Sequence, residues 1–160
     1  MEGINVIRKK ISILKRIRFL EHEDDSIELF EEILNEILQK ADNKVIIDLC
    51  SVFHDEIDEP SIVGDLIESI FYIIEKNGVE DGLSKVIEGI SIVLPQAKYC
   101  AKRFYRSLLA SDDFIIPFIN GLKKSKTTDK EDVINILKEI SEKQPQQYFE
   151  KVDLICKEVI

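Results

Sequence analysis

Apolar residues recur at spacings of three and four along almost the whole chain, which is the period of an amphipathic α-helix. This pattern predicts eight or nine helices. The positions expected to face inward in the first four are Ile4, Ile7, Ile11 and Leu14; Ile27, Phe30, Leu34, Ile37 and Ala41; Val45, Leu49 and Val52 or Phe53; and Val63, Leu66 or Ile67, Ile70 and Ile74. In the later helices they are Leu83, Val86 or Ile87, Ile90 and Leu94; Ala97, Cys100 or Ala101, Phe104 and Leu108; Val133, Ile136 or Leu137 and Ile140; and Phe149, Val152 and Ile155 or Cys156.

Residues that start or stop helices lie between these runs. Two pairs have the spacing of a capping box, in which two side chains satisfy two backbone N–H groups: Asp25 with Glu28, and Thr128 with Glu131. The other expected caps and first-turn prolines are Asp42, Ser111-Asp112, Pro60, Pro95 and Pro145. Asn77-Gly78 should end the fourth helix, and Pro117 can kink the short seventh one.

Two short apolar runs also suit β-strands. They are residues 44–47 and 113–116, and each is flanked by helical spacing. We therefore interpret them as helical and expect an all-α protein.

The expected helices fall into pairs of similar length, over about 43–77, 79–110 and 113–142. Each pair would expose an apolar face that only a neighbouring pair can cover, as in helical-repeat proteins. We favour a short HEAT-like α-solenoid over the alternative, an irregular helical bundle. Residues 1–160 should form a single domain, in which the basic segment 1–22 packs as a terminal cap.

The net charge of −9 is concentrated in the middle of the chain, because residues 42–94 hold twelve acidic and three basic residues. Such a block repels nucleic acid and attracts basic partners. It can also be simply a solvated face that keeps a protein in solution. The six carboxylates that we expect to contact a partner are Asp55, Glu56, Asp58 and Glu59 in an inter-helix turn, and Asp65 and Glu68 on the following helix.

We find no catalytic or cofactor-binding motif in the sequence. It contains no phosphate-binding glycine loop and no nucleophile elbow. It has only two histidines, and His54 beside Asp55 and Glu56 could be considered for a metal-dependent enzyme. One histidine with flanking acids does not have the spacing of a zinc site, so we expect a loop histidine, no metal and no cofactor.

A basic strip on the sixth expected helix could be considered for nucleic-acid binding. Its residues are Lys98, Lys102, Arg103 and Arg106, with Tyr99 and Tyr105 nearby. Because the neighbouring block is so acidic, we expect these cations to pair with acidic helices instead.

The three cysteines, Cys50, Cys100 and Cys156, are widely spaced and odd in number, which is typical of buried reduced thiols in the cytoplasm. No apolar stretch is long enough for a membrane span, and no signal peptide is expected.

Two stretches resemble the immunity protein 30 family of bacterial polymorphic-toxin and contact-dependent inhibition systems. The first is Leu49-Cys50-Ser51-Val52-Phe53-His54-Asp55-Glu56, which leads through Glu59 to Leu66-Ile67-Glu68-Ser69-Ile70. The second is Leu94-Pro95 followed by Ala97, Ala101, Phe104, Tyr105-Arg106 and Leu108-Leu109. The acid-rich helix from Glu28 to Gln39 fits the opening of the family, and together these stretches cover about residues 27–155.

This resemblance implies a small cytoplasmic protein that binds and neutralises a cognate toxin domain without catalysis. The toxins of such systems are diverse and frequently nucleases, and a basic toxin would suit an acidic inhibitor. The chemistry of the residues alone leaves an alternative open, an acidic helical-repeat adaptor or regulatory module with another protein partner.

Overall fold

The computed structural model describes residues 2–160, apart from the side chains of Glu2 and Ile4, so the inward position predicted for Ile4 lies outside the described part. Over these residues the chain forms nine α-helices and no β-strand. The helices are α1 (Glu2–Ile17), α2 (Ile27–Leu38), α3 (Ile46–Cys50), α4 (Pro60–Asn77), α5 (Val79–Val93), α6 (Lys98–Leu109), α7 (Ile115–Lys124), α8 (Thr127–Lys143) and α9 (Pro145–Val159). Short 3₁₀ turns, η1 (Asn43–Val45) and η2 (Asp112–Phe114), precede α3 and α7. The all-α prediction is confirmed, and the strand alternative for residues 44–47 and 113–116 is wrong.

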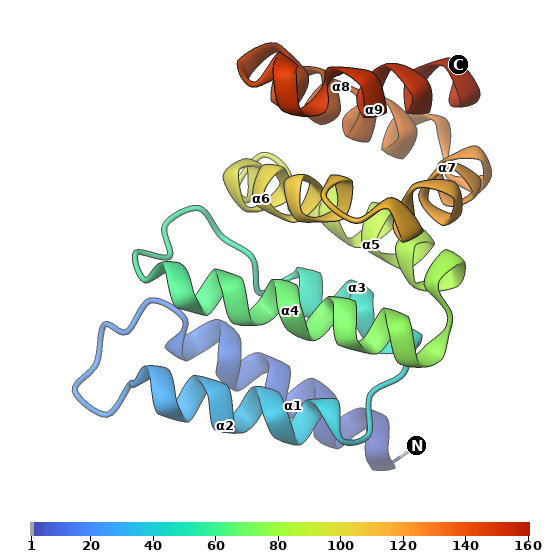
Figure 1. The fold of residues 1–160 in the computed structure, drawn as a ribbon. Helices are drawn as coiled ribbons and strands as arrows, with labels where there is room; N and C mark the ends of the chain where they lie inside the picture. The colour runs from blue at the N-terminus through green and yellow to red at the C-terminus, as the bar shows by residue number, and fades with distance from the viewer. Residues whose placement is uncertain (1) are drawn as a thin grey trace.

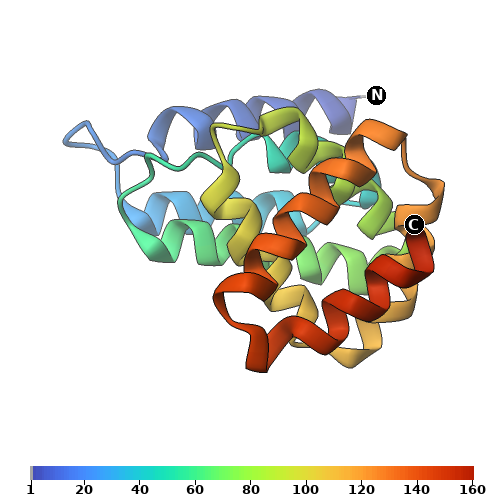
Figure 2. The ribbon, with the colours of Figure 1, turned by 90° about the horizontal axis from the view of Figure 1, so that it is seen from above.

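The helices stack in two layers that follow their order in the chain. Each odd-numbered helix packs against the next odd-numbered one, from α1 through α3, α5 and α7 to α9. In the other layer α2 packs against α4, and α6 packs against α8. Figure 1 shows the stack from the side, with the N-terminus at one end and the C-terminus at the other, and Figure 2 shows it from above. This layered arrangement is consistent with a short solenoid.

Small residues allow the odd-numbered helices to lie close together. A Cβ atom added to Gly89 of α5 would lie 2.9 Å from Cβ of Cys50 and 3.1 Å from the backbone Cα of Ile47, both on α3. A Cβ on Gly121 of α7 would lie 3.3 Å from Oγ of Ser84 on α5. Helix α5 therefore lies in backbone contact with α3 and α7, its neighbours in the same layer.

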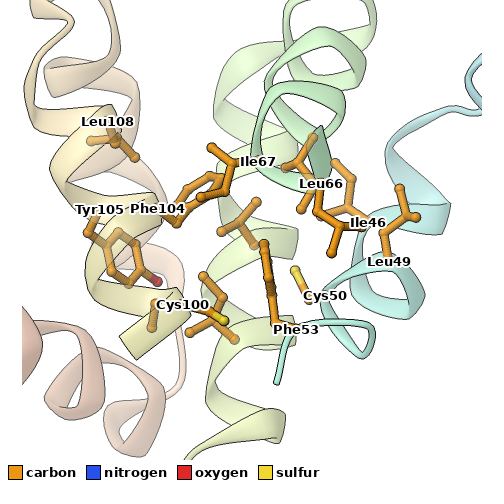
Figure 3. Close-up of a cluster of buried hydrophobic side chains, with 14 of the residues drawn as sticks. Ile46, Leu49, Cys50, Phe53, Leu66, Ile67, Cys100, Phe104, Tyr105 and Leu108 are labelled. Atoms are coloured by element: carbon orange, nitrogen blue, oxygen red, sulfur yellow. The ribbon is translucent and has the colours of Figure 1, made fainter. Parts of the chain in front are cut away.

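Large aromatic side chains fill the space between α4 and α6. The ring of Phe71 on α4 stacks on Phe104 of α6, with their centroids 4.7 Å apart, and on Phe114 of η2 at 5.3 Å. Figure 3 shows the adjoining core, in which buried side chains from α3, α4 and α6 meet around Phe53, Cys50 and Tyr105. The two layers are thus joined through one continuous apolar core.

Most positions predicted to face inward are buried, but Phe149 is 55% exposed. On α9 the buried positions are Tyr148, Val152 and Ile155, spaced by four and three. Phe149 lies one residue further along the helix, about 100° away around its axis. Ile27, Leu94 and Cys156 are only partly buried.

Several predicted helix boundaries are confirmed. The Asp42 carboxylate accepts a hydrogen bond from the backbone N–H of Lys44 at 2.9 Å. Pro60 and Pro145 are the first residues of α4 and α9, and Gly78 ends α4 with a φ of 114°, which favours glycine. Pro117 is the third residue of α7, where its missing N–H leaves no helical bond unmade.

Both predicted capping boxes are wrong. Helix α2 is capped by Ser26, whose hydroxyl accepts from the N–H of Leu29 at 3.0 Å, whereas Asp25 accepts from the N–H of His22. Thr128 lies inside α8, one residue after its start. Each pair has the residue spacing of a capping box, but the cap position of the helix lies one or two residues away from the first residue of the pair.

Two further predicted starts differ in detail. Helix α6 begins at Lys98, after a turn that contains Pro95, so Pro95 does not open it. Ser111 precedes the turn η2 as expected, but its side chain makes no capping hydrogen bond.

Gly89→Ala should destabilise the fold by about 1–3 kcal/mol, the usual cost of overpacking a close interface. The new methyl group would press on Cβ and Sγ of the buried Cys50 and on the backbone of Ile47, none of which is the end of a long flexible side chain. The matched control is Gly3→Ala in α1, where no described atom beyond its chain neighbours and its own helix backbone lies within 4 Å of the added Cβ, so stability should be unchanged or slightly higher. Urea unfolding of both variants measures the difference, and equal stabilities would contradict this account of α5.

Candidate functional site

The acidic turn, residues 51–59 between α3 and α4, is attached to the start of α6. The backbone N–H of Asp55 donates to the carbonyl of Gln96 at 2.8 Å. The two carboxylate oxygens of Asp55 accept from the N–H groups of Tyr99 at 3.0 Å and Cys100 at 3.1 Å. Asp55 therefore caps the first turn of α6, where the adjacent residue Ala97 offers no side-chain cap.

The other three acids of the turn differ in their surroundings. The carboxylate of Glu59 caps α4, because it accepts from the N–H of Ser61 at 3.3 Å and from its hydroxyl at 3.0 Å. Glu56 and Asp58 are exposed, and neither carboxylate forms a hydrogen bond or an ion pair with any described residue. Only these two carboxylates of the turn are left to solvent without a partner.

Asp65 and Glu68 line a different place, a groove between α2 and α4 with a volume of about 440 Å³. Glu31 of α2 brings a third carboxylate to it. We call it the acidic groove, and its other lining residues are Leu34, Asn35, Leu38, Ser69 and Tyr72. Sequence reasoning placed Asp65 and Glu68 on one helix face but missed Glu31, which joins them only because α2 packs on α4. The acid-rich run 28–39 is the sequence feature that could have indicated Glu31.

The acidic groove carries negative charge that the described residues do not neutralise. Burial raises the pKa of Asp65 from 3.8 to about 6, assisted by the hydrogen bond that its protonated form can donate to Glu31 and by repulsion from Glu31 and Glu68. No basic side chain of the described residues forms an ion pair with any of the three. A cation placed in the groove would relieve this repulsion.

A second groove, of about 430 Å³, lies on the other side of α4, between the acidic turn and α6. We call it the turn groove. Buried Ile57 and Val63 contribute apolar surface, and Asp58, Tyr99 and Arg106 contribute polar groups. Both grooves thus border α4, on opposite sides of the helix, and the acidic turn lies just before its first residue.

The basic strip on α6 is largely engaged within the fold. Lys98 and Lys102 form ion pairs at 2.9 and 3.2 Å, but with Glu139 of α8 rather than with the acidic block 42–94 that we expected, and the hydrogen bond from Lys98 helps to lower the pKa of that carboxyl. Arg103 differs from the expectation, because it donates to the backbone carbonyl of Pro60 at 2.9 Å. Arg106 lines the turn groove.

The histidine considered for metal binding has a local role in the turn. Nδ1 of His54 accepts from the N–H of Glu56 at 3.0 Å, and its ring meets Phe19 edge-on with the centroids 5.3 Å apart. Within residues 2–160, no three side chains of His, Cys, Asp or Glu come together as a metal site requires.

The three cysteines are free thiols in this structure. Cys50 and Cys100 are buried, as predicted, and Cys156 is partly exposed. Burial raises the pKa of Cys50 strongly and that of Cys100 to about 12, so neither is a reactive thiolate near neutral pH. In the described part of the chain, no helix combines the length and apolar character needed to cross a membrane.

In a comparison with models of known protein families, the chain matches the immunity protein 30 family over residues 16–118, which is more than half of its length. The chain belongs to this family. The family membership that the resemblance indicates is therefore confirmed. The match begins eleven residues earlier than the resembling stretch 27–155, and it ends well before that stretch does. No curated protein and no solved structure matches the chain.

The family match contains all three features of the candidate site. It runs from the end of α1 into α7, so it includes the acidic turn, the acidic groove and the turn groove. Within this immunity protein 30 chain, α8 and α9 lie beyond the matched residues.

Asp65→Asn should stabilise the folded chain above about pH 6. Because the pKa of Asp65 is higher in the folded chain than its ordinary 3.8, the folded state binds the proton more tightly. This group therefore lowers wild-type stability as the pH rises from 3.8 through about 6. Urea unfolding across this window should show the advantage of the variant growing with pH and then levelling off.

The control for this prediction is Glu75→Gln, an exposed position on α4 outside the acidic groove. It should show no such pH-dependent gain. An advantage of Asp65→Asn that is the same at every pH would mean that the repulsion in the groove is not its cause.

Proposed function

We propose that this immunity protein 30 chain binds the cognate toxin domain and neutralises it by occlusion, without catalysing a reaction. The observation that carries this proposal is the unneutralised acidic groove beside the acidic turn, both on α4, in a chain of this family. A binding protein needs a surface that is incomplete without its partner. Three carboxylates that repel one another, and that pair with no basic side chain of the described residues, form such a surface.

The interface that we propose contains the six predicted carboxylates and one more. Glu56, Asp58 and Glu68 are exposed, and Asp65 lies deeper beside Glu31. Asp55 and Glu59 lie in the same turn, although each is hydrogen-bonded to the start of a helix. All seven lie on or beside α2 and α4, the part of the stack that carries most of the excess negative charge.

The charge of this surface favours a basic partner. A concentrated negative potential speeds the encounter with a positively charged protein and disfavours acidic or nucleic-acid partners. A toxin that acts on nucleic acid has a basic substrate-binding surface, so a nuclease domain suits this inhibitor well. We propose that the carboxylates cover such a surface and thereby block access of the substrate.

The arrangement of the helices suits this role. We propose that the stack is a short HEAT-like solenoid acting in the cytoplasm, in which the even-numbered helices present the interface. Helices α2 and α4 contribute the acidic groove, and we propose that the turn before α4 extends the interface from there. Rigid helices keep these groups in place before the partner arrives, which limits the entropy lost on binding.

The direct test uses the toxin encoded beside this gene. Co-expression of the two chains should yield a complex that purifies together, and the immunity chain should protect cells that express the toxin. Absence of both binding and protection would contradict the proposal. A growth defect on deletion of this gene in cells without the toxin would instead support the adaptor alternative.

The triple variant Glu56→Gln, Asp58→Asn and Glu68→Gln should associate with the toxin about tenfold more slowly and show a weaker dependence on salt. The reason is that three exposed charges of the proposed interface are removed while the shapes of the side chains are kept. Stopped-flow or surface-binding kinetics at several salt concentrations measure the effect.

The matched control for this prediction changes the same amount of charge elsewhere. Glu131, Glu142 and Glu150 are exposed on α8 and α9, and replacing all three by Gln should have a much smaller effect on association. Equal effects of the two triple variants would show that only the net charge matters and would place the interface elsewhere.

A further inference from the structure

The beginning of the acidic turn is held in place by the segment that follows α1. Nη1 of Arg18 donates to the carbonyls of Ser51 and Val52, each at 3.1 Å. The same guanidinium lies over the ring of Phe19, 4.7 Å from its centroid, and Phe19 packs against His54. The segment that follows α1 therefore holds the carbonyls at the end of α3 and the first residues of the turn.

The end of the turn is fastened from α6. Arg103 donates to the carbonyl of Pro60 at 2.9 Å. Gly64 leaves the space for this side chain, because a Cβ there would lie only 2.8 Å from Nη2 of Arg103. Glu59 then caps the first turn of α4. These contacts determine where the turn joins α4.

The middle of the turn is held by Asp55 and by apolar packing. Both carboxylate oxygens of Asp55 bind α6, and its N–H binds the carbonyl of Gln96. Sγ of Cys100 lies 3.6 Å from the carbonyl of His54, and Ile57 is buried with 9% of its surface exposed. Between these fixed residues only the side chains of Glu56 and Asp58 are exposed without partners.

We propose that Asp55 is a positioning residue, which makes the acidic turn a preformed recognition element with Glu56 and Asp58 as its two contact carboxylates. This inference rests on the proposed function, since the partner is the basic surface of the toxin. It changes the role of Asp55 from a contact residue to the residue that sets where its neighbours point. The preferred occupant is a pair of Lys or Arg side chains on that surface.

The hydrogen bonds of Asp55 are the reason for this division of roles. If Asp55 turned to a partner cation, the N–H groups of Tyr99 and Cys100 would lose their acceptors at the start of α6. A helix start also favours a nearby negative charge. Glu56 and Asp58 lose no such bond when they meet a cation, so they are the groups that can bind a partner without disrupting the fold.

A preformed turn has a recognisable kinetic signature. Exposed charges at the rim of an interface act mainly on the association rate, through attraction at a distance. A residue that holds the bound geometry acts mainly on the dissociation rate, because its loss lets the contacts come apart. The two roles can therefore be separated in the same complex by measuring both rates.

The experiment compares Asp55→Ala, Asp55→Asn and the double variant Glu56→Gln with Asp58→Asn, all in the full chain. We expect Asp55→Ala to raise the dissociation rate from the toxin about tenfold while the association rate changes little. Asp55→Asn keeps an acceptor oxygen for one of the two N–H groups, so it should recover part of this loss. The double variant should lower the association rate and leave dissociation nearly unchanged.

Amide hydrogen exchange of the chain without toxin gives a second readout. The N–H groups of Tyr99 and Cys100 should exchange faster in Asp55→Ala, less so in Asp55→Asn, and at the wild-type rate in the double variant. Unfolding midpoints show whether each variant is folded at the temperature of the binding measurement, and Asp55→Asn replaces Asp55→Ala if the latter is not.

The outcomes distinguish the inference from the proposed function. If the wild-type chain binds no toxin, the proposed function fails, and the inference fails with it. If the wild-type chain binds, but Asp55→Asn slows association as the double variant does and leaves dissociation unchanged, Asp55 is a contact charge and the inference alone is overturned. Unchanged exchange of both amides in Asp55→Ala would overturn it as well.

Discussion

The close contact between α5 and α3 is the constraint on which the rest of the structure depends. It is possible because Gly89 has no side chain where it meets Cys50 and the backbone of Ile47. This contact places the odd-numbered helices in one layer and leaves the even-numbered ones to form the other. Helix α6 follows α5 in the chain, and its start lies within hydrogen-bond distance of Asp55 in the turn after α3.

The acidic surface follows from that layering. Helices α2 and α4 are neighbours in the second layer, and their facing sides bring Glu31 to Asp65 and Glu68. The raised pKa of Asp65 shows that the fold keeps this cluster at some cost in stability. Such unfavourable charge is common at functional sites, and a basic partner of the kind that we propose would offset the repulsion.

In the acidic turn, unlike in the acidic groove, some of the carboxylates have hydrogen-bond partners within the fold. The carboxylates of Asp55 and Glu59 cap helices, whereas the exposed carboxylates of Glu56 and Asp58 have no such partners among the described residues. Four acids that are equivalent in the sequence thus divide into two that hold the turn and two that a partner can meet. In the role that we propose for the turn, the two acids that hold it keep the other two in place for a partner.

The sequence by itself determined the helices, their approximate limits, most of the core and the location of the excess charge. It did so because these depend on period, on prolines and on local composition, which act over a few residues. The choice of Ser26 over Asp25 as a cap, the exposure of Phe149, and the meeting of Glu31 with Asp65 were decided only by the tertiary structure. The same holds for Asp55, whose hydrogen-bond partners lie 44 and 45 residues further along the chain. No local pattern encodes such a contact, because it exists only once α6 has packed beside the turn.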